Sequence, residues 1–210
     1  MADIISFSTY AKHQKIRIIF SSKAQKKGKR KPIKPKIQGD LDGLCGVYSV
    51  INAMRAVCKR KHVDKERLFK HLLHTLEKDT SIKDAMLTGT YKSHIDHMLK
   101  AATTYIGKKH GSKIAVQPLF KRKTKLRLGD YWKTVQAFLN ESNRGCILIG
   151  YRGKHDHWTV VHDVTDDALK LLDSGGSKRI RRSSCQLGKP SCNKYYYLLP
   201  SQVWGIRLQD

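Results

Sequence analysis

Residues 37–57 read IQGDLDGLCGVYSVINAMRAV and change character at a single cysteine, Cys45. The residues before it are small, acidic and rich in glycine, which is typical of a loop. The residues after it place apolar side chains three and four positions apart, which predicts a helix with one buried face. A thiol at the start of a helix lies beside unpaired backbone N–H groups and the positive end of the helix dipole. Both favour the nucleophilic thiolate form of Cys45.

More helices are expected after this stretch, followed by a sheet. Apolar spacing predicts helices over residues 64–78, 90–105 and 130–141, with Asp64 as the N-cap of the first. From residue 145 onward, short β-rich runs separated by Gly, Asp, Ser and Pro predict an antiparallel sheet. The order indicates an α+β fold, with a helical half over residues 37–144 and a sheet half over residues 145–210.

The charge of the chain is extreme, because 42 Lys and Arg against 17 Asp and Glu give a net charge of +25 over 210 residues. Such an excess indicates affinity for an acidic partner and says nothing about the fold. Residues 15–20, KIRIIF, are typical of a short strand, and the tract that follows, residues 21–36, is strongly basic. We expect residues 1–36 to form a solvated basic arm. Direct nucleic-acid binding is not favoured, because no aromatic side chains interleave the tract.

The cysteines and the N-terminal sequence bear on the compartment. Five cysteines without a C-x-x-C motif argue against a disulfide framework and against a compact zinc site. Cys58 and Cys146 are expected in the core, and Cys185 and Cys192 to be exposed and free, with a redox pair as the alternative. No signal peptide and no run of about 18 apolar residues for a membrane span is recognisable. We expect folding in a reducing cytosol, or export by a route without a cleaved signal.

A nucleophilic thiol needs a base, and the base needs a group that orients it. His157 begins the run HWTVVHDV, and Asp173 ends the run ALKLLD, with the turn-rich DVTDDA between them. If this segment folds as a hairpin centred near residue 165, His157 and Asp173 lie within one or two positions of each other across the strands. The spacing therefore predicts a His–Asp pair at one end of the sheet, on which the helix of Cys45 would have to dock.

Three more residues are candidates for the same site. Gln38 lies seven residues before Cys45, and its amide could hold the negative oxygen of a tetrahedral intermediate together with the Cys45 backbone N–H. Gly43 would let substrate come close, and Trp158 is either a pocket wall or a core residue. The rival pair His162–Asp163 lies further along the strand and is ranked below.

Two histidine pairs have the spacing of metal ligands, His71 with His74 and His94 with His97. Neither pair has an accompanying acidic or thiol pattern. We therefore expect solvated helix faces at both places, and no metal or cofactor.

The order of these residues resembles that of the papain-like cysteine peptidases over residues 37–208. The matching motifs are Gln38, GLCG entering an apolar helix, HW on a strand and LLDSGG. The resemblance implies a papain-like fold and peptide-bond cleavage, with Cys45 as nucleophile, His157 as base, Asp173 as orienting group and Gln38 in the oxyanion hole. It also implies that Trp204 forms a lid over the His–Asp pair.

An aspartate in the third position is similar to the bacterial double-glycine peptidases that trim leader peptides, which implies cleavage after Gly-Gly. The chain departs from both groups in two places. The gap from Gln38 to Cys45 is one residue longer, and Leu44 stands where Ser or Asp usually precedes the cysteine. These differences concern substrate preference more than chemistry.

Two other classes of function stay open. Transglutaminases, deamidases and N-acyltransferases use the same Cys–His–Asp logic, although Gln38 favours a peptidase. The second alternative is a non-catalytic basic binding module, against which the presence of all four site residues argues. For a peptidase of this charge, we expect an acidic or DNA-associated protein or peptide as substrate, and an acidic immunity or inhibitor protein as partner. Its role is either housekeeping or that of a bacterial toxin effector, exported by a specialised secretion system.

Overall fold

The structure is a computed structural model of the chain that describes residues 34–39, 42–58, 63–120, 126–142, 144–153, 155–188 and 194–209. All of these residues belong to one compact unit, Lys31–Asp210. The expected strand over residues 15–20 and most of the basic arm lie outside the described residues, as does Cys192.

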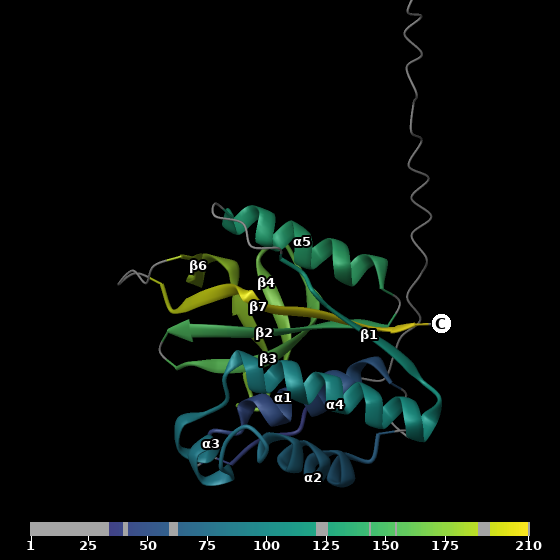
Figure 1. Cartoon of the computed structure of the whole chain (residues 1–210). Coiled ribbons are helices and arrows are strands. Elements are labelled where there is room, and N and C mark those ends of the chain that lie inside the picture. Colours follow the sequence, from purple (N-terminus) through teal and green to yellow (C-terminus); the bar gives the residue numbers. More distant parts are fainter. Residues whose placement is uncertain are drawn as a thin grey trace, which may run out of the picture. The chain divides into compact units, whose positions relative to one another are not determined.

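Four helices come first in the described part of this unit, α1 (Cys45–Val57), α2 (Lys65–Leu76), α3 (Ile82–Thr88) and α4 (Lys92–His110). Figure 1 shows them gathered on one side of the sheet. Asp64 caps α2 as expected, because its carboxylate accepts a hydrogen bond from the Arg67 N–H at 3.2 Å. The apolar spacing does not predict α3, which is seven residues long and buries only Ala85. None of the helices among the described residues has the length and apolar character that crossing a membrane requires.

After α4 the chain forms mainly an antiparallel sheet of seven strands in the order β1-β7-β2-β3-β4-β5, with β6 pairing in parallel with β7. The long strands are β2 (Gly145–Gly153), β3 (His157–Val164) and β7 (Tyr196–Gln209), and the short ones are β1 (Lys113–Pro118), β4 (Ala168–Leu172), β5 (Arg179–Arg181) and β6 (Cys185–Leu187). The α+β order expected from the sequence is therefore confirmed.

The boundary between the two halves differs from the prediction in two respects. The strand β1 lies within the range expected to be helical, and it pairs with β7 at the end of the chain. The helix α5 (Leu128–Glu141) also belongs to that range, but it packs on the opposite face of the sheet from α1. The sequence pattern could not reveal this, because apolar periodicity shows that a helix has a buried face and not which layer it joins.

The sheet is buried on both faces, with α1 and α4 on one side and α5 on the other (Figure 1). Alternate residues of β2 divide between the two cores: Cys146 and Leu148 face α1, whereas Ile147 and Ile149 face α5. Burial on both faces explains why these strands read as continuous apolar runs rather than as alternating patterns.

Polar contacts of two side chains, Ser49 and Asn52, join α1 to its surroundings. Ser49 donates a hydrogen bond to the carbonyl oxygen of Trp158 on β3 at 2.7 Å. The side-chain amide of Asn52 accepts from the backbone N–H of Lys36 at 2.8 Å and donates to the Lys36 carbonyl oxygen at 3.2 Å. The start of α1 is thereby held against the sheet, and the segment leading to Gln38 is held against α1.

Gly46, in the first turn of α1, lets this helix come close to Thr90 and Ile95. A Cβ at Gly46 would overlap the Thr90 side chain and lie 2.8 Å from Cδ1 of Ile95. We expect Gly46→Ala to lower the free energy of unfolding by about 1–3 kcal/mol, because the added methyl group overpacks a filled interface.

Gly107, inside α4, is the matched control. A Cβ there would be 3.5 Å from the nearest atom, the Ser112 carbonyl oxygen. Gly107→Ala should raise the free energy of unfolding by about 0.5–1 kcal/mol through helix propensity. Urea unfolding of both variants checks the pair, and equal effects would show that α1 does not pack as described.

Candidate active site

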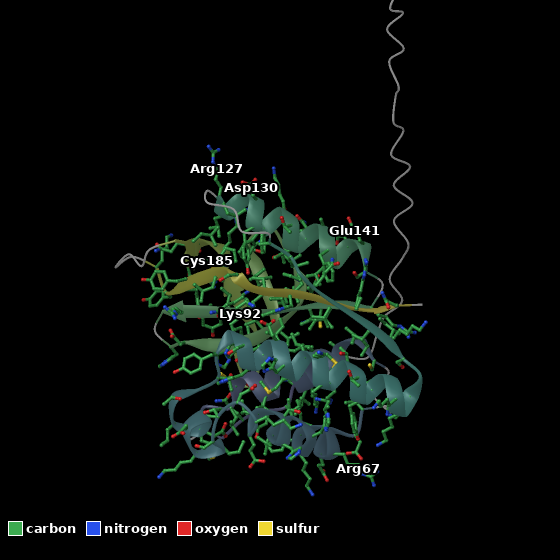
Figure 2. All side chains as sticks on the ribbon, viewed as in Figure 1. Arg67, Lys92, Arg127, Asp130, Glu141 and Cys185 are labelled. Atoms are coloured by element: carbon green, nitrogen blue, oxygen red, sulfur yellow. The ribbon has the colours of Figure 1, made fainter. Side chains whose placement is uncertain are left out.

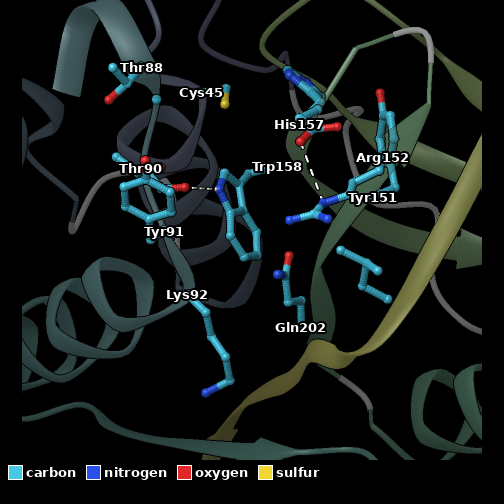
Figure 3. Close-up of a pocket in the computed structure, with 13 residues that line it drawn as sticks. Cys45, Thr88, Thr90, Tyr91, Lys92, Tyr151, Arg152, His157, Trp158 and Gln202 are labelled. Carbon is cyan, nitrogen blue, oxygen red and sulfur yellow. Dashed lines mark hydrogen bonds and ion pairs between the residues drawn. The ribbon is translucent and has the colours of Figure 1, made fainter. Parts of the chain in front are cut away.

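A cavity of about 130 Å³ lies where α1, the loop before α4, and strands β2, β3 and β7 come together (Figure 3). The residues that line it are Cys45, Thr88, Gly89, Thr90, Tyr91, Lys92, Tyr151, Arg152, Asp156, His157, Trp158, Leu199 and Gln202. One thiol and one imidazole therefore share a wall between the helices and the sheet.

Cys45 is the first residue of α1, and its side chain faces the strand end that carries His157 (Figure 3). The loop before it is organised by the Asp42 carboxylate, which accepts from the backbone N–H of Gly39 at 2.9 Å and from that of Leu44 at 3.0 Å. Leu44 itself is buried in the core beside α1. That burial explains an apolar residue where a polar one was expected.

His157 and Asp173 meet as the hairpin predicts. Nε2 of His157 lies 2.7 Å from Oδ1 of Asp173, whose side chain is only 2 % exposed. Because an ionised carboxylate only accepts hydrogen bonds, Nε2 carries the hydrogen. The other oxygen of Asp173 accepts from the Ser177 N–H at 3.0 Å. The nitrogen of His157 that is left free of this pair is Nδ1.

The environment of His157 favours the imidazolium. Burial lowers the pKa of His157, but the hydrogen bonds and negative charges of Asp173 and Cys45 outweigh it and raise the pKa to about 9. Asp173 responds in the opposite direction, because the hydrogen bond and the charge of His157 overcome burial and lower the pKa of its carboxyl. Cys45, His157 and Asp173 thus interact electrostatically as one group.

Gln38 is anchored beside the pair rather than in the cavity lining. Its backbone N–H donates to the Ser174 carbonyl oxygen at 3.1 Å, and the Ser174 hydroxyl donates to Gln38 Oε1 at 2.8 Å. Gln38 Nε2 donates one hydrogen to the Asp42 carbonyl oxygen at 3.0 Å. An amide nitrogen has two hydrogens, and none of the described residues accepts the second one. Ser174 and Asp42 therefore fix the orientation of the Gln38 amide, with Oε1 toward Ser174 and Nε2 toward Asp42.

The structure assigns the other candidates different surroundings. Gly43 packs against α3, since its N–H donates to the Met86 carbonyl oxygen at 2.8 Å, and the described cavity lining does not include it. Trp158 is both a core residue and a wall of the cavity, and its Nε1 donates to the Thr90 carbonyl oxygen at 2.8 Å. Trp204 bonds to Asp96 and packs on Trp158.

The ring that contacts His157 belongs to Tyr151, which the sequence analysis missed. The two ring centroids are 5.6 Å apart. Tyr151 lies opposite His157 in the register of β2 and β3, so the strand pairing could have found it. Burial is the main cause that raises the pKa of Tyr151. The charges of Asp173, Tyr196 and Cys45 raise it further, so the phenol stays neutral.

Three other cysteines are buried thiols. Burial raises the pKa of Cys58 to about 11 and that of Cys185 to about 12, and it also raises the pKa of Cys146. The expectation of a core position is confirmed for Cys58 and Cys146. Cys185 is a free thiol as expected, but the expectation that it is exposed is wrong. Its side chain is only 2 % exposed, because β6 pairs with β7 and turns it into the core on the α5 side. Figure 2 labels Cys185 in the sheet half of the chain.

The remaining histidines do not assemble a metal site among the described residues, where no three His, Cys, Asp or Glu side chains cluster. His94 is buried and accepts from the Tyr91 N–H at 3.2 Å, so the expectation of a solvated face is wrong there. His97 bonds to Asp79 at 2.6 Å. Asp163, the proposed partner of His162, pairs instead with Lys170 at 2.9 Å.

No protein-family model matches the chain, and no curated protein matches it either. The case for a function therefore comes from the residues and their geometry.

Two histidines on the same strand are expected to titrate in opposite directions. Asp173 and Cys45 raise the pKa of His157 to about 9, whereas partial desolvation and the Lys170 charge outweigh Asp163 and lower the pKa of His162. NMR titration of the imidazole signals checks both. Cys45→Ala should lower the pKa of His157 and leave that of His162 unchanged, and equal values for the two histidines would contradict the described contacts.

The raised pKa also fixes the sign of a pH effect on stability. The stabilisation that His157 gains from its partners is fully present below its unfolded pKa of about 6.5 and is lost as pH rises through about 9. The difference in free energy of unfolding between the wild type and His157→Ala should thus be smaller at about pH 10 than at about pH 6.

Proposed function

We propose that the chain is a cysteine peptidase that cleaves a protein substrate through Cys45, His157, Asp173 and Gln38. The observation that carries the proposal is the partly buried hydrogen bond of 2.7 Å between His157 and Asp173, with Cys45 acting on the same imidazole from the start of α1. A structural ion pair would not need a thiol on its open side, and a structural cysteine would not need a cavity in front of it.

Each residue has a role that its contacts support. Asp173 holds Nε2–H, so Nδ1 of His157 takes the proton of Cys45 and forms an imidazolium–thiolate pair. The thiolate attacks the carbonyl carbon of the scissile peptide, and the negative charge moves to the carbonyl oxygen. The second Nε2 hydrogen of Gln38 and the Cys45 backbone N–H stabilise that oxygen. When the C–N bond breaks, His157 returns its proton to the leaving amine, and water then hydrolyses the thioester with His157 as base.

A papain-like architecture belongs to the same proposal. It is supported by a cysteine at the start of a helix that packs on the sheet, by a histidine and an aspartate at adjacent strand ends, and by their order along the chain. The cavity is small, and its lining includes Gly89, which has a positive φ of 82°. Small residues at the scissile bond fit this shape, so a Gly-Gly target is the first candidate.

The proposed substrate is an acidic or DNA-associated protein, because the chain has a net charge of +25. An acidic inhibitor or immunity protein would keep such an enzyme in check. Export as a toxin effector and a housekeeping role are both compatible with the proposed chemistry.

The direct test compares cleavage by the wild type and by variants. Cys45→Ala and His157→Ala should each lose at least about a thousandfold in kcat/KM, because residues that act as a unit fail together. Asp173→Asn should lose less, since Asp173 orients the base and does not react. New protein N-termini in treated cell lysate, counted by mass spectrometry, give the activity.

Cys58→Ala is the matched control, because it removes a buried thiol that lies outside the cavity lining. It should stay within about twofold of the wild type. Loss of activity in Cys58→Ala with activity kept in Cys45→Ala would overturn the assignment. Ammonia release or acyl transfer to added amines, without new N-termini, would favour the acyltransferase and deamidase alternative.

The oxyanion role of Gln38 makes a separate prediction. Gln38→Ala should lower kcat about a hundredfold with little change in KM, because the lost N–H acts mainly in the transition state. Ser174→Ala removes the hydroxyl that holds the Gln38 amide and lets the amide turn. Its kcat should therefore lie between those of the wild type and Gln38→Ala. Ser183→Ala, at an exposed serine, is the control and should leave kcat unchanged. A change in KM alone would show that Gln38 binds substrate rather than the oxyanion.

A further inference from the structure

A second concavity, of about 300 Å³, lies between α1 and α2 and shares no residue with the cavity of Cys45. Its lining residues are Lys36, Tyr48, Ile51, Lys65, Glu66, Phe69 and Lys70, and we refer to it as the lysine-rimmed pocket. The rings of Tyr48 and Phe69 lie 5.6 Å apart beside the buried Ile51. An apolar hollow of this kind is a place where a partner's side chain can be buried.

The rim of this pocket carries excess positive charge. Three lysines face one glutamate, and Lys65 lies 4.0 Å from that glutamate, Glu66. A hydrogen bond with the Lys65 side chain lowers the pKa of Lys36 most, and partial burial and the positive charges of Lys65 and Arg55 lower it further. A carboxylate placed among these ammonium groups would relieve the repulsion.

We propose that the lysine-rimmed pocket docks an acidic segment of a partner protein, which buries one apolar side chain on Ile51 and Phe69 and places carboxylates beside Lys36, Lys65 and Lys70. Charge complementarity selects this occupant. A second copy of the chain has a net charge of +25, and residues 21–33 of the chain itself are basic, so both would be repelled. An inserted nucleic-acid base would bring polar edges into a largely apolar hollow, and burying them unpaired is unfavourable.

The position of the pocket allows docking without blockage of the cavity. Ile51 follows Cys45 by six residues in α1, which places it about 9 Å further along the helix axis. Lys36, on the rim, is bonded through its backbone to Asn52 of the same helix. The docking surface is thus part of the scaffold that holds α1, and the proposal does not depend on peptidase activity.

The test uses the full chain with Cys45→Ala, so that no probe is cleaved, and a fluorescein-labelled peptide with one leucine among aspartates and glutamates. Fluorescence anisotropy at about 150 mM salt gives Kd. Lys65→Glu with Lys70→Glu should weaken binding at least about tenfold. Lys83→Glu with Lys133→Glu, on exposed positions of α3 and α5, gives the same net charge and should change Kd less than about twofold.

Two further probes separate the apolar and acidic parts of the proposal. A peptide with leucine replaced by serine should bind at least about fivefold more weakly, and this comparison needs no change in the protein. A single-stranded oligonucleotide of equal charge should bind with equal affinity to both double variants. Equal losses of affinity in the two double variants, or equal Kd values for the serine and leucine peptides, would each overturn the proposal. So would an oligonucleotide that binds more weakly to the Lys65→Glu, Lys70→Glu variant than to the control variant.

Discussion

The hydrogen bond between His157 and Asp173 is the interaction on which the rest of the site depends. It forms at a nearly closed position, with 13 % of the His157 side chain and 2 % of the Asp173 side chain exposed, so solvent screens it little. Burial alone would make the imidazole neutral, yet Asp173 and Cys45 together hold its pKa at about 9. Asp173 binds Nε2 of His157 and leaves Nδ1 free. A thiol beside Nδ1 can then pass its proton to the imidazole.

A chain of polar contacts connects this pair to both halves of the fold. Ser174, next to Asp173, donates a hydrogen bond to the Gln38 amide oxygen. Asn52 of α1 bonds to the backbone of Lys36, two residues before Gln38. Ser49, one turn after Cys45, bonds to the carbonyl oxygen of Trp158, next to His157. Because these contacts run between α1 and the strand ends, α1 cannot shift on the sheet without disturbing the relation of thiol, imidazole and amide. The site is thus positioned by elements that are themselves buried.

The sequence was most informative where one local rule governs the outcome. The helix after Cys45, the cap at Asp64 and the hairpin that pairs His157 with Asp173 follow from periodicity, capping and strand spacing. Features decided by tertiary packing could not be predicted: α5 lies on the far face of the sheet, β1 pairs with a strand about ninety residues away, and β6 buries Cys185. Ser174 and Tyr151 became visible as partners of the site only through the register of neighbouring strands and the path of residues 34–39.

The central claim is that Cys45 is a nucleophile activated by His157. Labelling with a peptide epoxide that reacts with activated thiols tests it most directly, read by intact mass and then by peptide mapping. We expect one adduct per chain on Cys45, no adduct in Cys45→Ala, and labelling slowed at least about a hundredfold in His157→Ala. An adduct on another cysteine of a chain that still cleaves its substrate, or equal labelling rates with and without His157, would contradict it.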